Sequence, residues 1–155
     1  AWLESIEWLG PDESPVFKEG DPLAMELATA LTSPGLRKVF ERPTEDCQVF
    51  NERRFWLSEN DAAGAPVLWS GSIDRLVIEL KAGQPVQAHV FDFKTGSVDV
   101  EPESVRDSYR AQLEVYRRAV AQQFGLELGV IRMSLAMLDR GEVLELKPDL
   151  ETSLG

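Results

Sequence analysis

The chain has 155 residues, of which 43% are hydrophobic and 8% aromatic, enough for one sizeable core. We therefore expect a single domain over residues 1–148 and a flexible tail over 149–155. The formal net charge of −11 opposes binding to a polyanion unless basic groups gather locally or other domains supply them. No apolar run is long enough to span a bilayer and no signal peptide pattern occurs, which predicts a soluble, cytoplasmic protein without a membrane partner.

Helical spacing of apolar residues predicts helices over 2–9, over 22–31 and, after Ser33-Pro34, a short one ending near Phe40. Three β-rich runs over 48–57, 67–80 and 86–94 predict neighbouring antiparallel strands. An apolar stripe from Glu103 to Phe124 predicts a long helix across the sheet. Two further strands, 130–138 and 142–146, flank a hairpin signal at 139–141. The expected fold class is mixed α/β, with a central sheet of about five strands flanked by helices.

The chain opens on an amphipathic pattern without a methionine, so we expect a fragment of a longer chain. Its single cysteine, Cys47, cannot form an internal disulfide or hold an iron–sulfur cluster alone, and is expected to be a buried or half-buried small hydrophobe. The four tryptophans are expected in the core or at a domain interface; they are Trp2, Trp8, Trp56 and Trp69.

Charged residues fall on predicted strands where strand periodicity brings them together. In the strand over 90–94, Asp92 and Lys94 share one face, while Phe91 and Phe93 share the other. Asp74 lies in the preceding strand, and a buried carboxylate there is costly unless it is paired. We therefore expect Asp74, Asp92 and Lys94 to form one site at an end of the sheet.

Two carboxylates and a lysine suit the hydrolysis of a phosphodiester. Carboxylates bind a hard divalent cation such as Mg²⁺ or Mn²⁺, which polarises the phosphoryl group and acidifies a water, while the lysine stabilises developing negative charge. Gln112 and Tyr116 lie four residues apart on the long helix, so they share a face and can reach the same end of the sheet.

Three blocks of sequence carry a family resemblance. GSIDRL over 71–76, FDFKTG over 91–96 and YRAQLEVY over 109–116 resemble, in order, the G-x-I-D-R, D-x-K-T and Y-x-x-Q-L-x-x-Y series of RecB-like nuclease domains in the PD-(D/E)XK superfamily. ERRF over 52–55 resembles the E-x-P-F strand that precedes them, although Arg54 replaces the usual proline. Similarity over the rest of the chain is weaker.

The resemblance implies a restriction-endonuclease-like core and a set of site residues. Asp74, Asp92 and the backbone carbonyl of Phe93 are then metal ligands for Mg²⁺ or Mn²⁺, and Lys94 is the catalytic lysine. Gln112 and Tyr116 complete the catalytic set as helix-borne supporting residues. Relatives with iron–sulfur clusters are excluded, because one cysteine cannot replace their cysteine clusters.

The resemblance also implies an exonuclease-type hydrolase, a module of an ATP-dependent helicase–nuclease of the AddA, RecB or UvrD type that processes DNA ends in repair and recombination. Its expected partners are single-stranded DNA, the helicase domains of the parent chain and a possible second subunit. ATP is expected to act only through those helicase domains. Many such domains carry a metal-ligating histidine on the first helix, and none occurs over 1–9, so we expect it before Ala1. The only histidine, His89, falls on the Phe91 face and is not nominated.

Other readings of these residues stay open. The chain can be a nuclease fold kept for DNA binding or scaffolding without cleavage, or an unrelated ligand-binding domain whose carboxylates hold a structural metal. Asp92 and Lys94 can form a plain salt bridge, and Glu52 can be a structural partner or a site member. Five arginines can form a DNA-contacting patch or serve solubility and ion pairing; they are Arg106, Arg110, Arg117, Arg118 and Arg132.

Overall fold

The computed structural model describes residues 32–41, 46–96 and 99–147, together with positions 22, 25 and 28. The elements in chain order are α2 (Pro34–Phe40), β1 (Cys47–Asn60), β2 (Pro66–Lys81), β3 (Gln84–Lys94), α3 (Pro102–Phe124), the short 3₁₀ helix η2 (Leu128–Val130), β4 (Ile131–Met137) and β5 (Glu142–Leu146). The predicted mixed α/β fold with a five-stranded sheet is confirmed. The predicted helix over 2–9 and the tail over 149–155 lie outside the described residues.

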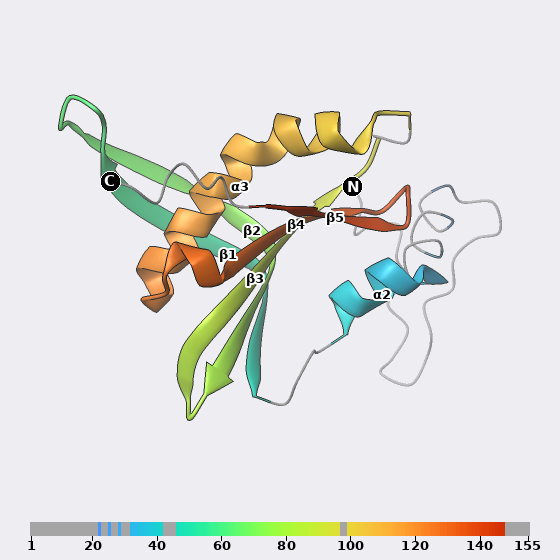
Figure 1. The fold of residues 1–155 in the computed structure, drawn as a ribbon, viewed down its shortest axis with the longest axis horizontal. Helices are drawn as coiled ribbons and strands as arrows, with labels where there is room; N and C mark the ends of the chain where they lie inside the picture. Colours follow the sequence, from blue (N-terminus) through green and yellow to red (C-terminus); the bar gives the residue numbers. More distant parts are fainter. Residues whose placement is uncertain are drawn as a thin grey trace.

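The five strands are ordered β1-β2-β3-β4-β5 in one sheet (Figure 1). Neighbouring pairs are antiparallel, as predicted for the first three strands and for the β4–β5 hairpin, except that β3 and β4 run parallel. A parallel pair needs a crossover connection, and α3 supplies it. Among the described positions of the predicted helix over 22–31, Pro22, Met25 and Ala28 are helical.

Helix α3 has sequence signals at both of its ends. Pro102 occupies its first turn, and Gly125 ends it in the left-handed conformation with φ of 66°. Its buried stripe includes Leu113 and Val120, which pack on the sheet with about 1.5–3 kcal/mol gained for each fully buried apolar side chain. No helix within the described ranges is long and apolar enough to cross a membrane.

The two faces of the sheet carry different helices. One face packs against α3 and holds the larger core, which includes Leu76 and Val90. The other face packs against α2, where Leu36 contacts a smaller cluster that includes Phe91 and Cys47. Cys47 is only 2% exposed, so the expectation of a buried small hydrophobe is confirmed.

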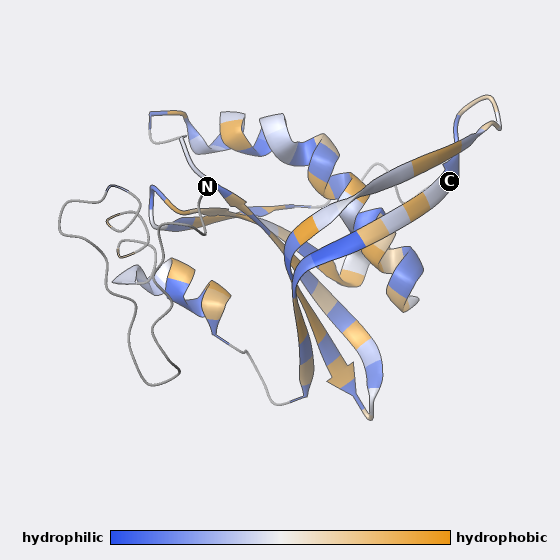
Figure 2. Ribbon diagram, turned by 180° about the vertical axis from the view of Figure 1, so that it is seen from behind, coloured by the Kyte–Doolittle hydropathy of each residue, from blue (hydrophilic) through white to orange (hydrophobic). Residues whose placement is uncertain are grey.

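Strands β1 and β2 continue together beyond β3 as a two-stranded ribbon over 53–73, called the arm below. The last β2–β3 pair is Arg75 with Phe91, whereas β1–β2 pairing runs on to Asn60 with Pro66. The arm projects from the body of the molecule in Figure 1, and Figure 2 shows apolar and polar residues alternating along it. Trp56 and Trp69 lie on the arm and are 61% and 44% exposed, so they are not core residues.

Candidate functional site

The ladder between β2 and β3 ends where Asp74 and Asp92 would face each other. Continuing the register from the last pair, Arg75 with Phe91, places these two aspartates in the next position. Instead of a backbone pair, Asp74 Oδ2 accepts a 2.7 Å hydrogen bond from the backbone N–H of Phe93. A side-chain carboxylate therefore replaces a backbone carbonyl where the backbone pairing of β2 and β3 stops, a point called the opening between β2 and β3 below.

The backbone carbonyl of Phe93 is directed to the same opening. In a β-strand the N–H and C=O of one residue point to the same side, and successive residues alternate. The N–H of Phe93 points to Asp74 on the β2 side, so its carbonyl does too. The carbonyl of Lys94 points the other way, accepting a 2.9 Å hydrogen bond from the N–H of Leu138 beyond β4, as the alternation requires.

Asp92 and Lys94 form a largely buried ion pair in this opening. Lys94 Nζ lies 2.7 Å from Asp92 Oδ2, and Asp92 is only 3% exposed. Apart from this ion pair, Asp92 Oδ2 has no hydrogen-bond partner within the described ranges. The ammonium also lies 4.4 Å from the ring centroid of Tyr109, a cation–π distance that fixes the lysine from a second side.

Gln112 and Tyr116 join the site from α3. Gln112 Nε2 donates a 2.6 Å hydrogen bond to the Tyr116 hydroxyl oxygen and a long one of 3.4 Å to Asp92 Oδ1. The Tyr116 ring packs edge-on against Phe55 with centroids 5.3 Å apart, so the ring is in the core while the hydroxyl reaches the site. Because this hydroxyl accepts from Gln112, its own proton is available for another acceptor.

The site holds more negative than positive charge. Burial raises the pKa of Asp92, and the charge of Asp74 raises it further, against the opposing effect of Lys94. Burial lowers the pKa of Lys94, but the hydrogen bond and charge of Asp92 outweigh burial, so that pKa is raised. Burial also raises the pKa of Tyr116, and both aspartates add to the effect. The site contains two carboxylates and one ammonium, and the ammonium pairs with Asp92 alone, so the charge balance favours a further cation.

The donor set fits a hard divalent cation. Asp74, Asp92 and the Phe93 carbonyl offer oxygen ligands at one opening, and Mg²⁺ is commonly held by one or two carboxylates while keeping several waters. In the part of the chain that the structure describes, no three histidine, cysteine, aspartate or glutamate side chains lie close enough together to hold a metal ion by themselves. A cation at this opening would therefore need the Phe93 carbonyl or water molecules in addition to the two aspartates.

Tyr109 also lies next to the site, a position that the sequence pattern did not predict. It lies three residues before Gln112 on α3, within the third resembling block, and its ring faces the lysine. Glu52 lies opposite Asp74 between the β1–β2 pairs Asn51 with Arg75 and Arg53 with Ile73. Its positive φ of 53° interrupts regular pairing, and its side chain is exposed.

The five arginines considered as a DNA-contacting patch are each paired with a carboxylate. Arg106 and Arg110 pair with Glu103 and Asp107, one turn earlier on α3. The remaining pairs are Arg117 with Glu114, Arg118 with Glu59, and Arg132 with Glu145. Their charges are compensated locally, which favours the solubility and ion-pairing reading.

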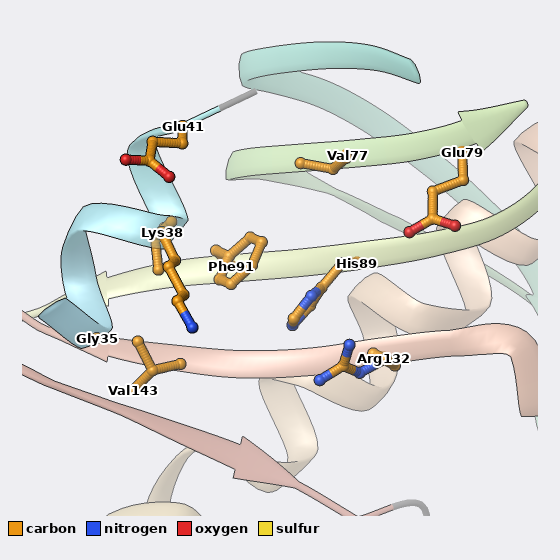
Figure 3. Close-up of a pocket in the computed structure, with 10 residues that line it drawn as sticks. Gly35, Lys38, Glu41, Val77, Glu79, His89, Phe91, Arg132 and Val143 are labelled. Atoms are coloured by element: carbon orange, nitrogen blue, oxygen red, sulfur yellow. The ribbon is translucent and has the colours of Figure 1, made fainter. Parts of the chain in front are cut away.

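A cavity of about 320 Å³ lies on the other face of the sheet under α2 and is lined by none of the predicted site residues. Figure 3 shows Lys38 of α2 and Arg132 of β4 with His89 between them on the sheet. His89 stacks on Phe91 with centroids 3.8 Å apart, and its Nε2 lies 2.8 Å from Ser134 Oγ. Burial, with the nearby Arg132 charge, lowers the pKa of His89 to about 4. Because successive residues of β3 alternate between the two faces of the sheet, His89 lies on the face opposite Asp92.

Comparison with known proteins adds no family assignment. No protein-family model matches the chain, and no curated protein matches it significantly. The resemblance to RecB-like nucleases is carried by three sequence blocks, whose residues Asp74, Asp92, Lys94, Gln112 and Tyr116 meet at one opening of the sheet.

Proposed function

We propose that this chain is a metal-dependent DNA nuclease module that hydrolyses phosphodiester bonds. The observation that carries the proposal is the meeting of all three resembling blocks at the point where β2 leaves β3. Asp74 comes from the first block, Asp92 and Lys94 from the second, and Gln112 and Tyr116 from the third. These residues are far apart in the sequence, so their proximity comes from the tertiary fold and not from local structure.

Each residue has a task that its geometry supports. Asp74, Asp92 and the Phe93 carbonyl would hold Mg²⁺ or Mn²⁺, which when bound supplies a Lewis acid for the phosphoryl oxygen and an acidified water. The Lys94 ammonium stabilises negative charge that develops on the phosphate. Gln112 orients Asp92 through its long hydrogen bond and holds the Tyr116 hydroxyl through a short one, which leaves the hydroxyl proton for another acceptor.

The proposed setting is an ATP-dependent helicase–nuclease that processes DNA ends, with this chain as its exonuclease-type module. The net charge of −11 supports that setting, because the chain by itself repels DNA and helicase domains can supply a basic track. Single-stranded DNA produced by unwinding is the proposed substrate. A second subunit is part of the same proposal.

One observation favours a second candidate, a nuclease fold that binds DNA or serves as a scaffold without cleaving. Lys94 already neutralises Asp92 at 2.7 Å, and Asp74 already bonds the backbone of β3. In that case the charged cluster only holds the end of the sheet together. Substitution of the lysine separates the two candidates, since a structural ion pair affects stability and a catalytic lysine affects turnover.

The test measures cleavage of 5′-labelled single-stranded DNA with Mg²⁺ or Mn²⁺ by the wild type, by Lys94→Ala and by Lys38→Ala as a matched control. Lys38 is an exposed lysine on α2, on the other face of the sheet. We expect metal-dependent cleavage that Lys94→Ala reduces by about 10²-fold or more and Lys38→Ala leaves unchanged. Near-normal cleavage by a folded Lys94→Ala protein contradicts the proposal. Lys94→Gln, which keeps a polar side chain of similar length, replaces it if Lys94→Ala fails to fold.

A further inference from the structure

The arm has one face that no described element covers. Phe55 and Leu57 of β1 point toward α3 and are each 2% exposed, with Phe55 against the Tyr116 ring. Because successive strand residues alternate, Arg54 and Trp56 point to the opposite face. Trp56 is 61% exposed there, a large aromatic surface on a ribbon of only two strands. The Trp56 indole is therefore open to contact by a ligand on this face.

Beside this tryptophan the arm has a notch. On β2, Ser70 pairs with Trp56 and Ser72 pairs with Arg54, so both hydroxyls share the uncovered face. Between them Gly71 pairs with Phe55 and so faces the α3 side, where a Cβ at that position would lie 2.9 Å from the Phe55 ring. The hollow at this part of the arm, called the arm notch, measures about 270 Å³ and is lined by Arg54, Phe55, Trp56, Ser70, Gly71 and Ser72.

Arg54 supplies an uncompensated cation at the arm notch. It has no carboxylate partner within the described ranges, unlike Arg118, which pairs with Glu59 on the α3-facing side of the arm. The neighbouring Arg53 is held over the Phe50 ring at 4.6 Å. A free guanidinium beside an open indole and two hydroxyls combines a phosphate contact, a stacking surface and hydrogen-bonding groups that do not discriminate between bases.

We propose that the arm notch binds single-stranded nucleic acid, with a base stacked on Trp56 and the adjacent phosphate at Arg54. The inference rests on the proposed nuclease function and names the path by which its substrate reaches the site. An apolar protein surface fits less well, because covering Arg54, Ser70 and Ser72 without partners carries a desolvation cost.

The arm notch is also close to the candidate active site. Ser72 lies two residues and Ser70 four residues before Asp74 on the same strand, which is roughly 7 and 13 Å at the rise of a β-strand. The arm notch and the opening between β2 and β3 are therefore a short distance apart along β2. The notch places nucleic acid near the reacting residues without contributing a catalytic group.

The experiment measures binding of fluorescein-labelled oligo(dT) by anisotropy at low salt with EDTA present, so that cleavage is not needed. Trp56→Ala is compared with Trp69→Ala, a control of the same residue type on the same arm, 44% exposed on the opposite face. We expect Trp56→Ala to weaken binding by about tenfold or more and Trp69→Ala to change it little. We expect Arg54→Ala to reduce the slope of log K against log salt by about 0.7.

Equal affinity in Trp56→Ala and the wild type, or equal losses in the two tryptophan variants, overturns the inference. So does wild-type self-association that Trp56→Ala abolishes without any effect on oligo(dT) binding, since the face then serves a second copy of the chain. The two proposals fail separately. Trp56-dependent binding without metal-dependent cleavage contradicts the nuclease alone, whereas normal cleavage with Trp56-independent binding contradicts the arm notch alone.

Discussion

The two faces of β3 each bury a titratable group, yet only one has the composition of a reactive site. On the α3 face, Asp92 lies beside Lys94 and near Asp74, with two carboxylates to one ammonium. On the α2 face, His89 is stacked on Phe91 and hydrogen-bonded to Ser134. A shifted pKa occurs on both faces, so the shift by itself does not identify a site.

The difference lies in what each face leaves unsatisfied. Burial keeps His89 neutral at physiological pH, and its contacts to Phe91 and Ser134 use its ring and one nitrogen. The α3 face retains an excess carboxylate charge and an Asp92 oxygen with no partner but Lys94 in the described part of the chain. A cation or substrate can neutralise the excess negative charge at the opening between β2 and β3. The contacts of His89 instead contribute to the stability of the fold.

The largest effect that tests this comparison concerns stability and pH. The pKa of His89 is lowered from 6.5 to about 4. Between these two values His89 is protonated in the unfolded chain and neutral in the folded chain. This contribution to stability is present above pH 6.5 and is lost as pH falls toward 4, by up to about 3 kcal/mol. We expect urea unfolding at pH 7 and pH 4.5 to show a smaller loss of stability for His89→Gln than for the wild type.

The comparison with His89→Gln isolates this residue from other groups that titrate in the same range. Five charged side chains face His89 from the surrounding elements: Lys38 of α2, Glu41 directly after α2, Glu79 of β2, Arg132 of β4 and Glu145 of β5. They are unchanged in the variant. If both proteins lose the same stability between the two pH values, His89 is not held neutral by the fold.

A smaller effect is expected on the α3 face of β3, where Tyr116 and Gln112 of α3 contact the candidate site. Tyr116→Phe keeps the ring against Phe55 and removes only the hydroxyl that accepts from Gln112. We expect cleavage to fall about tenfold, as for groups that orient metal ligands, while the free energy of unfolding falls by about 1 kcal/mol. Single-turnover cleavage and urea unfolding of the same preparation measure both. Unchanged turnover with the same stability loss assigns Tyr116 to the core alone.

Much of the fold followed from residue periodicity. The α3 stripe and the β-rich runs predicted the helix and strands within a few residues, and alternation placed Asp92 and Lys94 on the face opposite Phe91. The antiparallel pairing of consecutive strands was also predictable from the sequence, because strands joined by short turns most simply pair with each other in antiparallel orientation.

Other features depend on register and were not predictable from local pattern. The hydrogen bond from the Phe93 N–H to Asp74 exists only because β2–β3 pairing stops at Arg75 and Phe91. Of the two positions predicted for Trp56, the core is wrong, because the arm carries Trp56 beyond the body of the sheet, where α3 covers only the other face; a domain interface stays a prediction. Tyr109 meets Lys94 across elements, a contact that spacing within α3 cannot reveal.

The most direct test of the nuclease proposal compares two substitutions on the two faces of one strand. Asp92→Asn keeps the shape of the side chain and removes its charge, while His89→Gln changes the opposite face three residues away. In Mn²⁺-dependent cleavage of labelled single-stranded DNA, we expect Asp92→Asn to lose about 10³-fold or more in rate and His89→Gln to cleave like the wild type. Metal-dependent cleavage that survives in a folded Asp92→Asn protein contradicts the assignment of this opening as the active site.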